Sequence, residues 1–383
     1  MLKVIWRELG LMRHNGLYVA CLVVFPLLVM IFFTTLMKEG QPTEMPVGVV
    51  DLDNSTVSRK IVRSLDAFQN TNVKGYYTDV AAAREALQKG EIYAFIYFPH
   101  DCMANMMSGK QPGISFYYTM SFLSAGSLLM ADLKTMTTLG YAGVAKAKLE
   151  AMGVPDNMII PLLQPIKVEL HKVGNPQTDY NAYLSPMLVP GVMLLFIFIF
   201  TAYSIGMELK FNRSREWLDA AGGNIVVALT GKMLPQMLLS MMMMLGYLIY
   251  IYGVMGFPHE GSWGVMLLLG VLTVLAAEGF GIFMFALVPS VRMSMSMCSL
   301  WAVLSFSMVG TAYPVMAMDP ALEALAWLFP LRHYFVIYQT SVFNGYPLAD
   351  CWINVACLIG FALLPLPLLW RLKKAMKEFV YMA

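Results

Sequence analysis

The stretch Leu184–Met207, LSPMLVPGVMLLFIFIFTAYSIGM, decides the fold class, because it is long, apolar and free of charged residues. A helix needs about 20 apolar residues to cross the roughly 30 Å hydrocarbon core of a bilayer. Five further stretches have this character: Leu17–Met37, Met233–Phe257, Trp263–Val288, Met293–Met318 and Cys351–Trp370. Only Trp263–Val288 contains a charged residue, Glu278. The sequence therefore predicts an α-helical polytopic membrane protein with six transmembrane helices.

The composition agrees with this prediction and excludes several other classes. The 383 residues are 58% apolar and 13% charged, with a net charge of +2. A soluble domain is about 45–50% apolar and about 25% charged. A nucleic-acid-binding protein would need an excess of basic residues. Of the five cysteines only Cys102 lies outside the predicted spans, which excludes a disulfide framework, and no spacing of Cys and His predicts a metal site.

The lysines and arginines of the short connections predict the orientation, because these residues stay on the cytoplasmic side. One side carries Lys3, Arg7, Arg13, Lys210, Arg213, Arg215, Lys232, Arg292, Arg371, Lys373, Lys374 and Lys377. The short connections on the other side hold only Arg332. Both termini are therefore expected in the cytoplasm. Segment 38–183, which holds more than half of the charged residues, is expected on the extracytoplasmic side.

These assignments divide the chain into four parts. Residues 1–16 are expected to form a cytoplasmic interfacial helix, 17–37 the first span as a retained anchor, 38–183 an extracytoplasmic α/β domain, and 184–383 a five-span membrane domain. Within 38–183, strands are predicted at Val47–Leu52, Val73–Tyr77, Ile92–Phe98 and Ile114–Tyr118. Helices are predicted from a cap at Asp53–Ser55 to Gln69, at Val80–Lys89 after Asp79, and at Ser121–Met152, followed by an extended return through Ile166–Val173. Alternating strands and helices favour a small α/β layer with partly parallel strands.

Nothing in this α/β segment predicts catalysis. Asp51, Asp53 and Asp101 lie at predicted strand ends, where catalytic carboxylates can lie, but aspartates at these positions are usually turn and cap residues. His100 and His171 are isolated in the sequence. We therefore expect a scaffold or docking domain without catalytic, cofactor-binding or metal-binding residues.

The connection after Leu184–Met207 is the most informative motif. It reads ELKFNRSREWLDAA from Glu208, then Gly222-Gly223-Asn224, then LTGKMLP ending at Pro235. This order predicts a charged amphipathic helix near 208–224, a glycine turn and re-entry into the membrane. It resembles the connection of ABC-2-type permeases, which runs E-x-x-R, then G-T-x-E-x-L, then a turn and G-K-x-x-P. The last element is present here, whereas Glu216-Trp217 replaces the Gly-Thr pair.

Three further segments carry the same resemblance. The N-terminal segment places Leu2, Ile5, Trp6, Leu9 and Met12 on one helical face, as in an interfacial helix before the first span. VGVVDLDNS from Val47 and GEIYAFIYFP from Gly90 are similar to the large external domain of the multidrug-exporter-like branch. FPLRHY from Phe329 resembles the signature N-P-L-R-Y-F after the fifth span.

The resemblance implies a permease subunit of an ATP-driven exporter in the bacterial cytoplasmic (inner) membrane. It implies a second permease copy or a paralogue as dimer partner, and separate ABC ATPase subunits that hold ATP and Mg. A periplasmic adaptor protein and an outer-membrane channel are further partners of this branch. The chain itself lacks the glycine-rich phosphate loop G-x-x-x-x-G-K-[ST]. The residues expected to couple the permease to the ATPase are Arg213, Arg215, Glu216, Asp219 and Lys232; the alternative is that their charges are merely solvated.

Two residues outside this connection are candidates for the transport path. Glu278 is costly in hydrocarbon, so it should face a cavity, pair across helices or stay protonated. Two half-helices near 320–348, Ala321–Phe329 and His333–Phe343, suggest a re-entrant pair with Arg332 at the break between them. Arg332 would either help to gate an external exit or extend its side chain to the membrane interface.

The cargo and the competing functions follow from the same spans. Nearly uncharged spans suit an amphipathic or hydrophobic cargo, and the 33 methionines offer adaptable apolar contacts or simply replace leucine. One alternative is a non-transporting membrane receptor or anchor that displays the external domain. A membrane enzyme is the other alternative, but it would need a polar catalytic cluster that Glu278 and Arg332 do not make.

Overall fold

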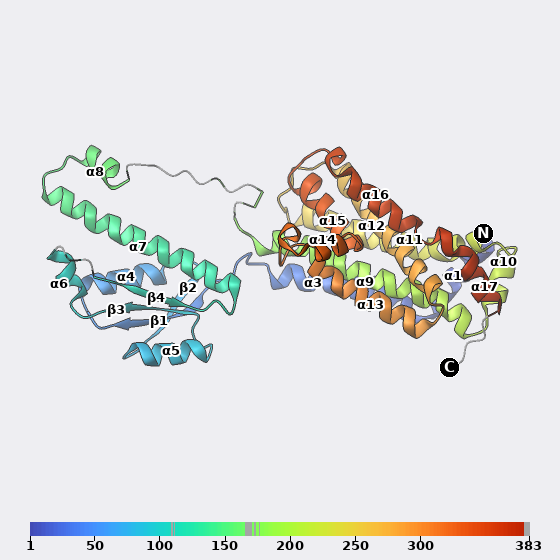
Figure 1. Ribbon diagram of the computed structural model, residues 1–383, viewed down its shortest axis with the longest axis horizontal. Helices are drawn as coiled ribbons and strands as arrows, with labels where there is room; N and C mark the ends of the chain where they lie inside the picture. Colours follow the sequence, from blue (N-terminus) through green and yellow to red (C-terminus); the bar gives the residue numbers. More distant parts are fainter. Residues whose placement is uncertain (109, 111, 165–170, 172–173, 176, 379–383) are drawn as a thin grey trace. The chain divides into compact units, whose positions relative to one another are not determined.

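The computed structural model describes residues 1–108, 110, 112–164, 171, 174–175 and 177–378. The chain forms two compact units, which Figure 1 shows together with the labels of their elements. The membrane unit consists of Met1–Lys38 and Lys172–Ala383, and the α/β unit of Glu39–His171. The extended return expected at Ile166–Val173 falls almost entirely on residues outside those described.

The α/β unit is a four-stranded sheet with helices on both faces. Its strands are β1 (Met45–Asp51), β2 (Thr71–Tyr76), β3 (Ala94–Phe98) and β4 (Ser115–Tyr118). They lie in the order β2-β1-β3-β4. β1 is parallel to β2 and β3, whereas β4 is antiparallel to β3. The helices are α4 (Thr56–Asp66), α5 (Val80–Gln88), α6 (Cys102–Met107), α7 (Leu123–Ala151) and α8 (Asp156–Leu163).

The alternation of side chains along the strands separates two cores. Val47 and Val49 of β1 pack with Leu65 of α4 and Leu129 of α7 on one face of the sheet. Val50 points to the other face, where it packs in the cluster that contains Ala83 of α5. Successive residues of a strand point to opposite faces, so both faces of this unit are covered.

The cap of α4 lies within the expected segment Asp53–Ser55. Ser55, not Asp53, caps this helix, because its side chain accepts a hydrogen bond from the Ser58 backbone nitrogen at 3.0 Å. Asp53 instead accepts from the Met103 nitrogen at 3.2 Å. Asp51 accepts from Asn54 and from the Ser58 hydroxyl, so these aspartates hold turns in place. Asp79 caps α5 as expected, accepting from Ala82 at 2.8 Å.

All regular secondary structure in the described part of the membrane unit is helical. Among the described residues, five helices are long and apolar enough to cross a membrane: Gly16–Leu36, Tyr180–Lys210, Ile225–Val254, Trp263–Leu287 and Leu348–Glu378. They comprise α2 (Gly16–Val19), η1 (Ala20–Val24) and α3 (Phe25–Leu36); α9 (Tyr180–Lys210); α11 (Ile225–Ile249) and η2 (Tyr250–Val254); α12 (Trp263–Leu287); and η5 (Leu348–Cys351), α16 (Trp352–Leu363), η6 (Leu366–Leu368) and α17 (Leu369–Glu378). Five of the six expected spans thus have a counterpart.

The span expected at Met293–Met318 is shorter in the structure. Helix α13 runs over Val291–Met308, and Gly310 then turns the chain with φ of 103°. Its serines and Arg292 lower its hydropathy, which is why α13 is not among the five. The short helices α1 (Leu2–His14), α10 (Ser214–Ala220), η3 (Val315–Ala317), α14 (Pro320–Ala326), α15 (Pro330–Ile337) and η4 (Tyr338–Phe343) complete the unit.

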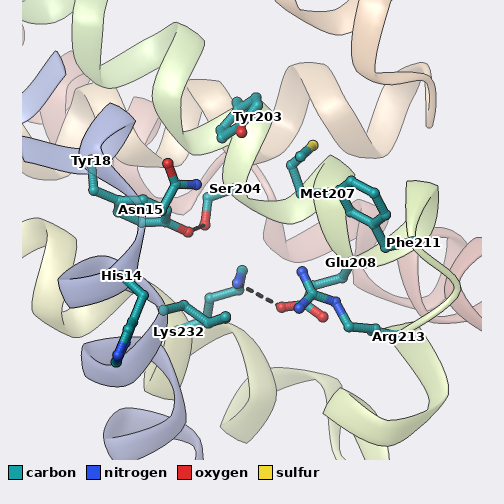
Figure 2. A pocket seen from close by; sticks show the side chains of 11 residues that line it. His14, Asn15, Tyr18, Tyr203, Ser204, Met207, Glu208, Phe211, Arg213 and Lys232 are labelled. Carbon is teal, nitrogen blue, oxygen red and sulfur yellow. Dashed lines mark hydrogen bonds and ion pairs between the residues drawn. The ribbon is translucent and has the colours of Figure 1, made fainter. Parts of the chain in front are cut away.

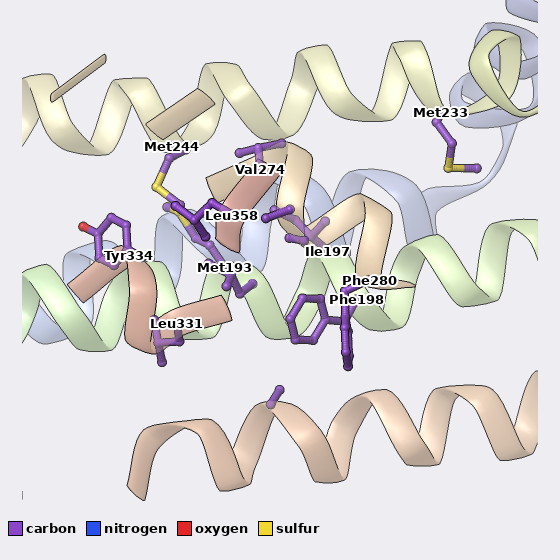
Figure 3. Packing of buried hydrophobic residues seen from close by; sticks show 14 of the residues in the cluster. Met193, Ile197, Phe198, Met233, Met244, Val274, Phe280, Leu331, Tyr334 and Leu358 are labelled. Carbon is purple, nitrogen blue, oxygen red and sulfur yellow. The ribbon is translucent and has the colours of Figure 1, made fainter. Parts of the chain in front are cut away.

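Helix α9 is the centre of the membrane unit. Met193, Ile197 and Phe198 of α9 lie in one apolar core with residues of α11, α12, α15 and α16 (Figure 3). Pro190 has no N–H, so it cannot donate to the carbonyl of Pro186. The hydroxyl of Tyr334 in α15 donates to that carbonyl at 3.0 Å and satisfies it.

Glycines bring α12 close to its neighbours. A Cβ on Gly279 would lie 2.4 Å from the carbonyl oxygen of Phe361 in α16, and one on Gly281 2.8 Å from Thr201 in α9. The two glycines therefore let α12 pack tightly between α9 and α16, because a larger side chain would push the helices apart.

Candidate functional site

A buried cluster of charges joins the N-terminal helix α1 to the ends of α9 and α11. Its centre is Lys232 of α11, whose side chain is 1% exposed. The Nζ atom donates to Glu8 Oε2 at 2.6 Å and to Glu208 Oε1 at 2.9 Å. Glu8 comes from α1 and Glu208 from α9, so one ammonium group connects three helices (Figure 2 shows its bond to Glu208).

Arg7 completes the charge balance from the surface side. Its guanidinium donates to both oxygens of Glu208, at 2.8 and 2.7 Å. This fork geometry is the strongest form of an arginine–carboxylate pair. The hydrogen bond to Glu208 raises the pKa of Arg7, although burial works against it. Arg7 and Lys232 together neutralise Glu8 and Glu208.

The remaining acceptor capacity of Glu8 is used by neutral side chains. Its Oε1 accepts from the Tyr18 hydroxyl at 2.8 Å, from Gln236 Nε2 at 2.9 Å and from the Ser204 hydroxyl at 3.3 Å. Gln236 also donates to Ser204 at 2.7 Å. A buried ion pair is stable only when such partners satisfy its atoms. The ion cluster, defined here as Arg7, Glu8, Tyr18, Ser204, Glu208, Lys232 and Gln236, meets this condition for both carboxylates.

The sequence Gly231-Lys232 has a physical explanation at this site. A Cβ on Gly231 would lie 2.8 Å from Val4 Cβ of α1. Glycine therefore lets α1 approach α11 closely enough for Glu8 to reach Lys232. The next turn supplies Gln236, so one helical face of α11 docks α1 by shape and by charge.

The connection between α9 and α11 is not the single helix expected near 208–224. Helix α9 ends at Lys210, and Asn212 follows with φ of 56°. The nitrogens of Asn212 and Arg213 donate back to the carbonyls of Leu209 and Glu208, a pattern that terminates helices. The separate helix α10 then begins at Ser214.

Helix α10 has a buried side and an exposed side. Trp217 is fully buried, and Lys232 Nζ lies 5.8 Å from the centre of its ring. The Ser214 hydroxyl donates to the Met376 carbonyl of α17 at 2.8 Å, and Arg215 donates to the Lys377 carbonyl at 3.2 Å. The N-terminal helix, α10 and the C-terminal helix therefore meet at one end of the membrane unit.

The structure separates the five coupling candidates. Arg215, Glu216 and Asp219 are exposed on α10, and Glu216 lies 3.9 Å from Arg7. Arg213 is half-buried in the connection and lies 5.5 Å from the ring centre of Phe211. Lys232 is buried in the ion cluster, so it is not part of an exposed contact surface.

A cavity of about 360 Å³ lies beside the ion cluster (Figure 2). Its wall is made by the end of α1, the start of the first span, the last turns of α9, Arg213 and Lys232. The lining residues are Leu11, His14, Asn15, Tyr18, Tyr203, Ser204, Met207, Glu208, Phe211, Arg213 and Lys232.

The two other candidates lie away from this cluster. Glu278 is 5% exposed inside α12, and within the described residues its carboxyl has no hydrogen bond or ion pair. It is not the only charged residue in a span, because Glu208 and Lys232 lie within α9 and α11. Arg332 is half-buried near Gly310. Its neighbour His333 is fully buried, between Asn354 at 2.9 Å and the Trp327 carbonyl at 2.8 Å.

Sequence reasoning missed most of the ion cluster. Arg7 entered only as a positive charge of the N-terminal segment, and Glu8 was not singled out. The signal was present in the spacing: Val4 and Glu8 are the buried residues of α1, on the side away from exposed Leu2 and Trp6. Glu208 and Lys232 were visible as charges at the ends of apolar stretches, but their pairing required the fold.

The comparison with protein families identifies the class. Residues 17–371 match the family described as ABC-2 family transporter protein. The match covers most of the chain, and the chain therefore belongs to the ABC-2 transporter family. It is a membrane permease of an ABC transporter, a transport subunit, and membership of this family implies association with ABC ATPases. No curated protein matches the chain.

Proposed function

We propose that this chain is the permease subunit of an exporter that moves an amphipathic or hydrophobic substrate across the bacterial cytoplasmic membrane. The observation that carries the proposal is the arrangement of α10. Its charged side is exposed, and its other side buries Trp217, whose ring faces Lys232 of the ion cluster. Family membership supports the transport role, and the nearly uncharged core of the membrane unit supports the class of substrate.

Energy for transport comes in this proposal from ATP and Mg held by separate ATPase subunits. The exposed charges of α10, Arg215, Glu216 and Asp219, would contact the ATPase on the cytoplasmic side. The Lys- and Arg-rich end of the membrane unit, where α1, α10 and α17 meet, would therefore be cytoplasmic, and both termini with it. The α/β unit would be extracytoplasmic, and α13 would be the sixth span.

The ion cluster would transmit the movement of α10 to the spans. A push on α10 acts on Trp217, which packs under Lys232, and Lys232 is bonded to α1 and α9. A cluster of short bonds in a closely packed interior moves as a unit rather than deforming. Movement at α10 would thus tilt α9 and α11 together, and α9 is the centre of the core.

The outer parts of the transporter follow the same proposal. A second permease copy or a paralogue would complete the translocation path, and a periplasmic adaptor and outer-membrane channel would continue it. Glu278 would face this path or the dimer interface, and Arg332 would lie in a re-entrant pair made by α14, α15 and η4 near its exit.

Affinity purification in mild detergent, followed by reconstitution into vesicles, tests this function. We expect an ABC ATPase to co-purify and ATP to drive movement of a lipophilic fluorescent dye. The absence of both would contradict the exporter and favour a non-transporting receptor or anchor.

Charge reversal separates the contact surface from the fold. Arg215→Glu together with Glu216→Arg should release the ATPase and abolish ATP-dependent transport, while the purified permease keeps its unfolding temperature. Arg84→Glu, an exposed arginine of α5 in the other unit, is the matched control and should retain both. ATPase association that survives the double reversal would remove α10 from the coupling surface.

A further inference from the structure

The cavity beside the ion cluster contains an arginine without a partner. Within the described residues, the Arg213 guanidinium makes no hydrogen bond or ion pair, and its Nε is buried and unsatisfied. A buried donor without an acceptor is costly, so its presence calls for a ligand. The guanidinium lies 5.5 Å from the centre of the Phe211 ring.

The carboxylates of the cavity cannot neutralise Arg213. Glu208 is the one acidic residue in the lining, and it is already bonded to Arg7 and Lys232. The four charges of the ion cluster balance one another. Lys210 lies on the same Phe211 ring, at 6.0 Å, and adds a second positive charge. The electrostatics of the opening therefore favour an anion, and a guanidinium fork suits phosphate.

The other walls of the cavity are apolar. Tyr203, Met207 and Phe211 line it along one face of α9, and Phe196 and Phe200 continue that face by helical spacing toward the middle of the span. The first span lies along this stripe: Tyr18 packs on Phe200 at 4.5 Å and Phe25 on Phe196 at 5.5 Å between ring centres. A second, smaller crevice lies farther along the same helices and is lined by Cys21, Leu22, Pro26, Met193, Phe196, Ile197, Ser240 and Met243.

We propose that this cavity binds the phosphate group of an anionic phospholipid from the leaflet at the α10 end of the membrane unit. Arg213 holds the phosphate, Asn15 and Tyr203 lie at the headgroup, and the acyl chains run along α9 beside the first span. Basic pockets between helices at this membrane depth are suited to anionic headgroups. A free phosphate would use the same guanidinium but would not fill the apolar part of the cavity beside Tyr203, Met207 and Phe211.

The site extends beyond the proposed export function, because the bound lipid would join α1, the first span and α9 independently of any ATPase. Lys232 lines the cavity, so the bound lipid would lie next to the ion cluster. The lipid would therefore stabilise the docking of α1 in the purified permease.

Native mass spectrometry of the purified full-length chain tests the site without transport or ATPase. The probes are phosphatidylglycerol, diacylglycerol with the same acyl chains, and inorganic phosphate. We expect one tightly bound phosphatidylglycerol, at least five-fold less of it with Arg213→Ala, and wild-type binding with Arg292→Ala, an exposed arginine of α13 outside the cavity. Arg213→Lys should bind at an intermediate level, because charge remains but the fork is lost.

Several outcomes would overturn the proposal. Equal binding of diacylglycerol would show that the phosphate is not recognised, and displacement of the lipid by inorganic phosphate would assign the site to free phosphate. An equal loss in Arg213→Ala and Arg292→Ala would indicate general attraction to a basic surface. Unchanged unfolding temperatures without lipid confirm that the variants are folded.

Discussion

Buried carboxylates occur in two different settings in the membrane unit. Glu8 and Glu208 are 1% exposed and are bonded to two cations and three neutral side chains. Glu278 is 5% exposed in α12 and, within the described residues, has no such partner. The first setting binds helices to one another, whereas the second leaves a polar group for which the described part of the membrane unit supplies no partner.

The comparison teaches that burial alone does not define a role. Removing one member of a paired cluster leaves an uncompensated buried charge, which costs roughly 3–5 kcal/mol. Replacing a carboxyl that has no partner breaks no bond. The variants below therefore test whether the paired carboxylates are structural and whether the lone one is free for another role.

Lys232→Ala should have the largest effect. It leaves Glu8 and Glu208 facing each other with only Arg7 to compensate, so we expect the free energy of unfolding to fall by about 3–5 kcal/mol. Thermal unfolding in detergent measures this. Lys374→Ala is the control, because Lys374 forms an exposed pair with Glu378 at 3.8 Å. Equal unfolding temperatures for both variants would contradict a structural ion cluster.

A double-mutant cycle distinguishes the two contacts of Arg7. The fork to Glu208 is short and protected, whereas Glu216 lies 3.9 Å away and is 72% exposed. We expect a coupling energy of roughly 1.5–3 kcal/mol for Arg7 and Glu208. For Arg7 and Glu216 we expect about 0–1 kcal/mol. Comparable coupling energies would mean that the bidentate geometry contributes nothing.

Gly231→Ala tests whether shape as well as charge docks α1. The new Cβ would lie 2.8 Å from Val4 Cβ, so α1 must move and Glu8 with it. We expect a loss of about 1–3 kcal/mol, the usual effect of overpacking. Gly246→Ala in the same helix meets nothing within 4 Å and should be neutral or slightly stabilising. The difference between the two unfolding temperatures is the measurement; if Gly231→Ala is as stable as Gly246→Ala, α1 does not need this close approach.

Glu278→Gln should change the free energy of unfolding by less than about 1 kcal/mol, because the isosteric amide breaks no ion pair. The same variant assayed for ATP-driven dye export separates the proposed roles. A stable variant with lost export would place Glu278 in the transport path. A destabilised variant would reveal a structural partner and remove the contrast with Glu8 and Glu208.

The sequence predicted the features that depend on local residue patterns. Apolar length marked the helices at Leu184–Met207 and Trp263–Val288 closely, and alternation of strands and helices marked β1, β2, β3 and β4. It overextended Met293–Met318, because an apolar run does not reveal where a glycine with positive φ turns the chain. Nor did the sequence show that the helix expected near 208–224 is interrupted at Asn212, whose left-handed conformation separates α9 from α10.

The ion cluster lay beyond sequence reasoning for a different reason. Glu8 and Lys232 are 224 residues apart in the chain, and Arg7 and Glu208 are 201 apart. Periodicity shows which face of α1 is apolar, but here the exposed face carries Leu2 and Trp6, while Glu8 is buried. A buried glutamate opposite an exposed apolar face is explained only by a partner helix that supplies the compensating charge. The family motif indicated Lys232 but not what it binds.

A third carboxyl extends the comparison to the α/β unit and should give the smallest effect. Asp132 of α7 is partly buried, and its Oδ2 has no hydrogen-bond partner in the described part of the chain. Burial raises the pKa of Asp132, with a hydrogen bond from Asn70 acting in the opposite direction. A carboxyl whose pKa is higher in the folded state stabilises the fold below its unfolded pKa, and this contribution is lost as pH rises through the folded value.

The unfolding temperature of Asp132→Asn should therefore rise relative to that of the wild type as pH rises above about 4, and the difference should then stay constant. Asp156→Asn, at an exposed aspartate of α8, should show no such trend. A difference between Asp132→Asn and the wild type that shrinks with rising pH would show that this carboxyl is paired when ionised, as Glu8 and Glu208 are.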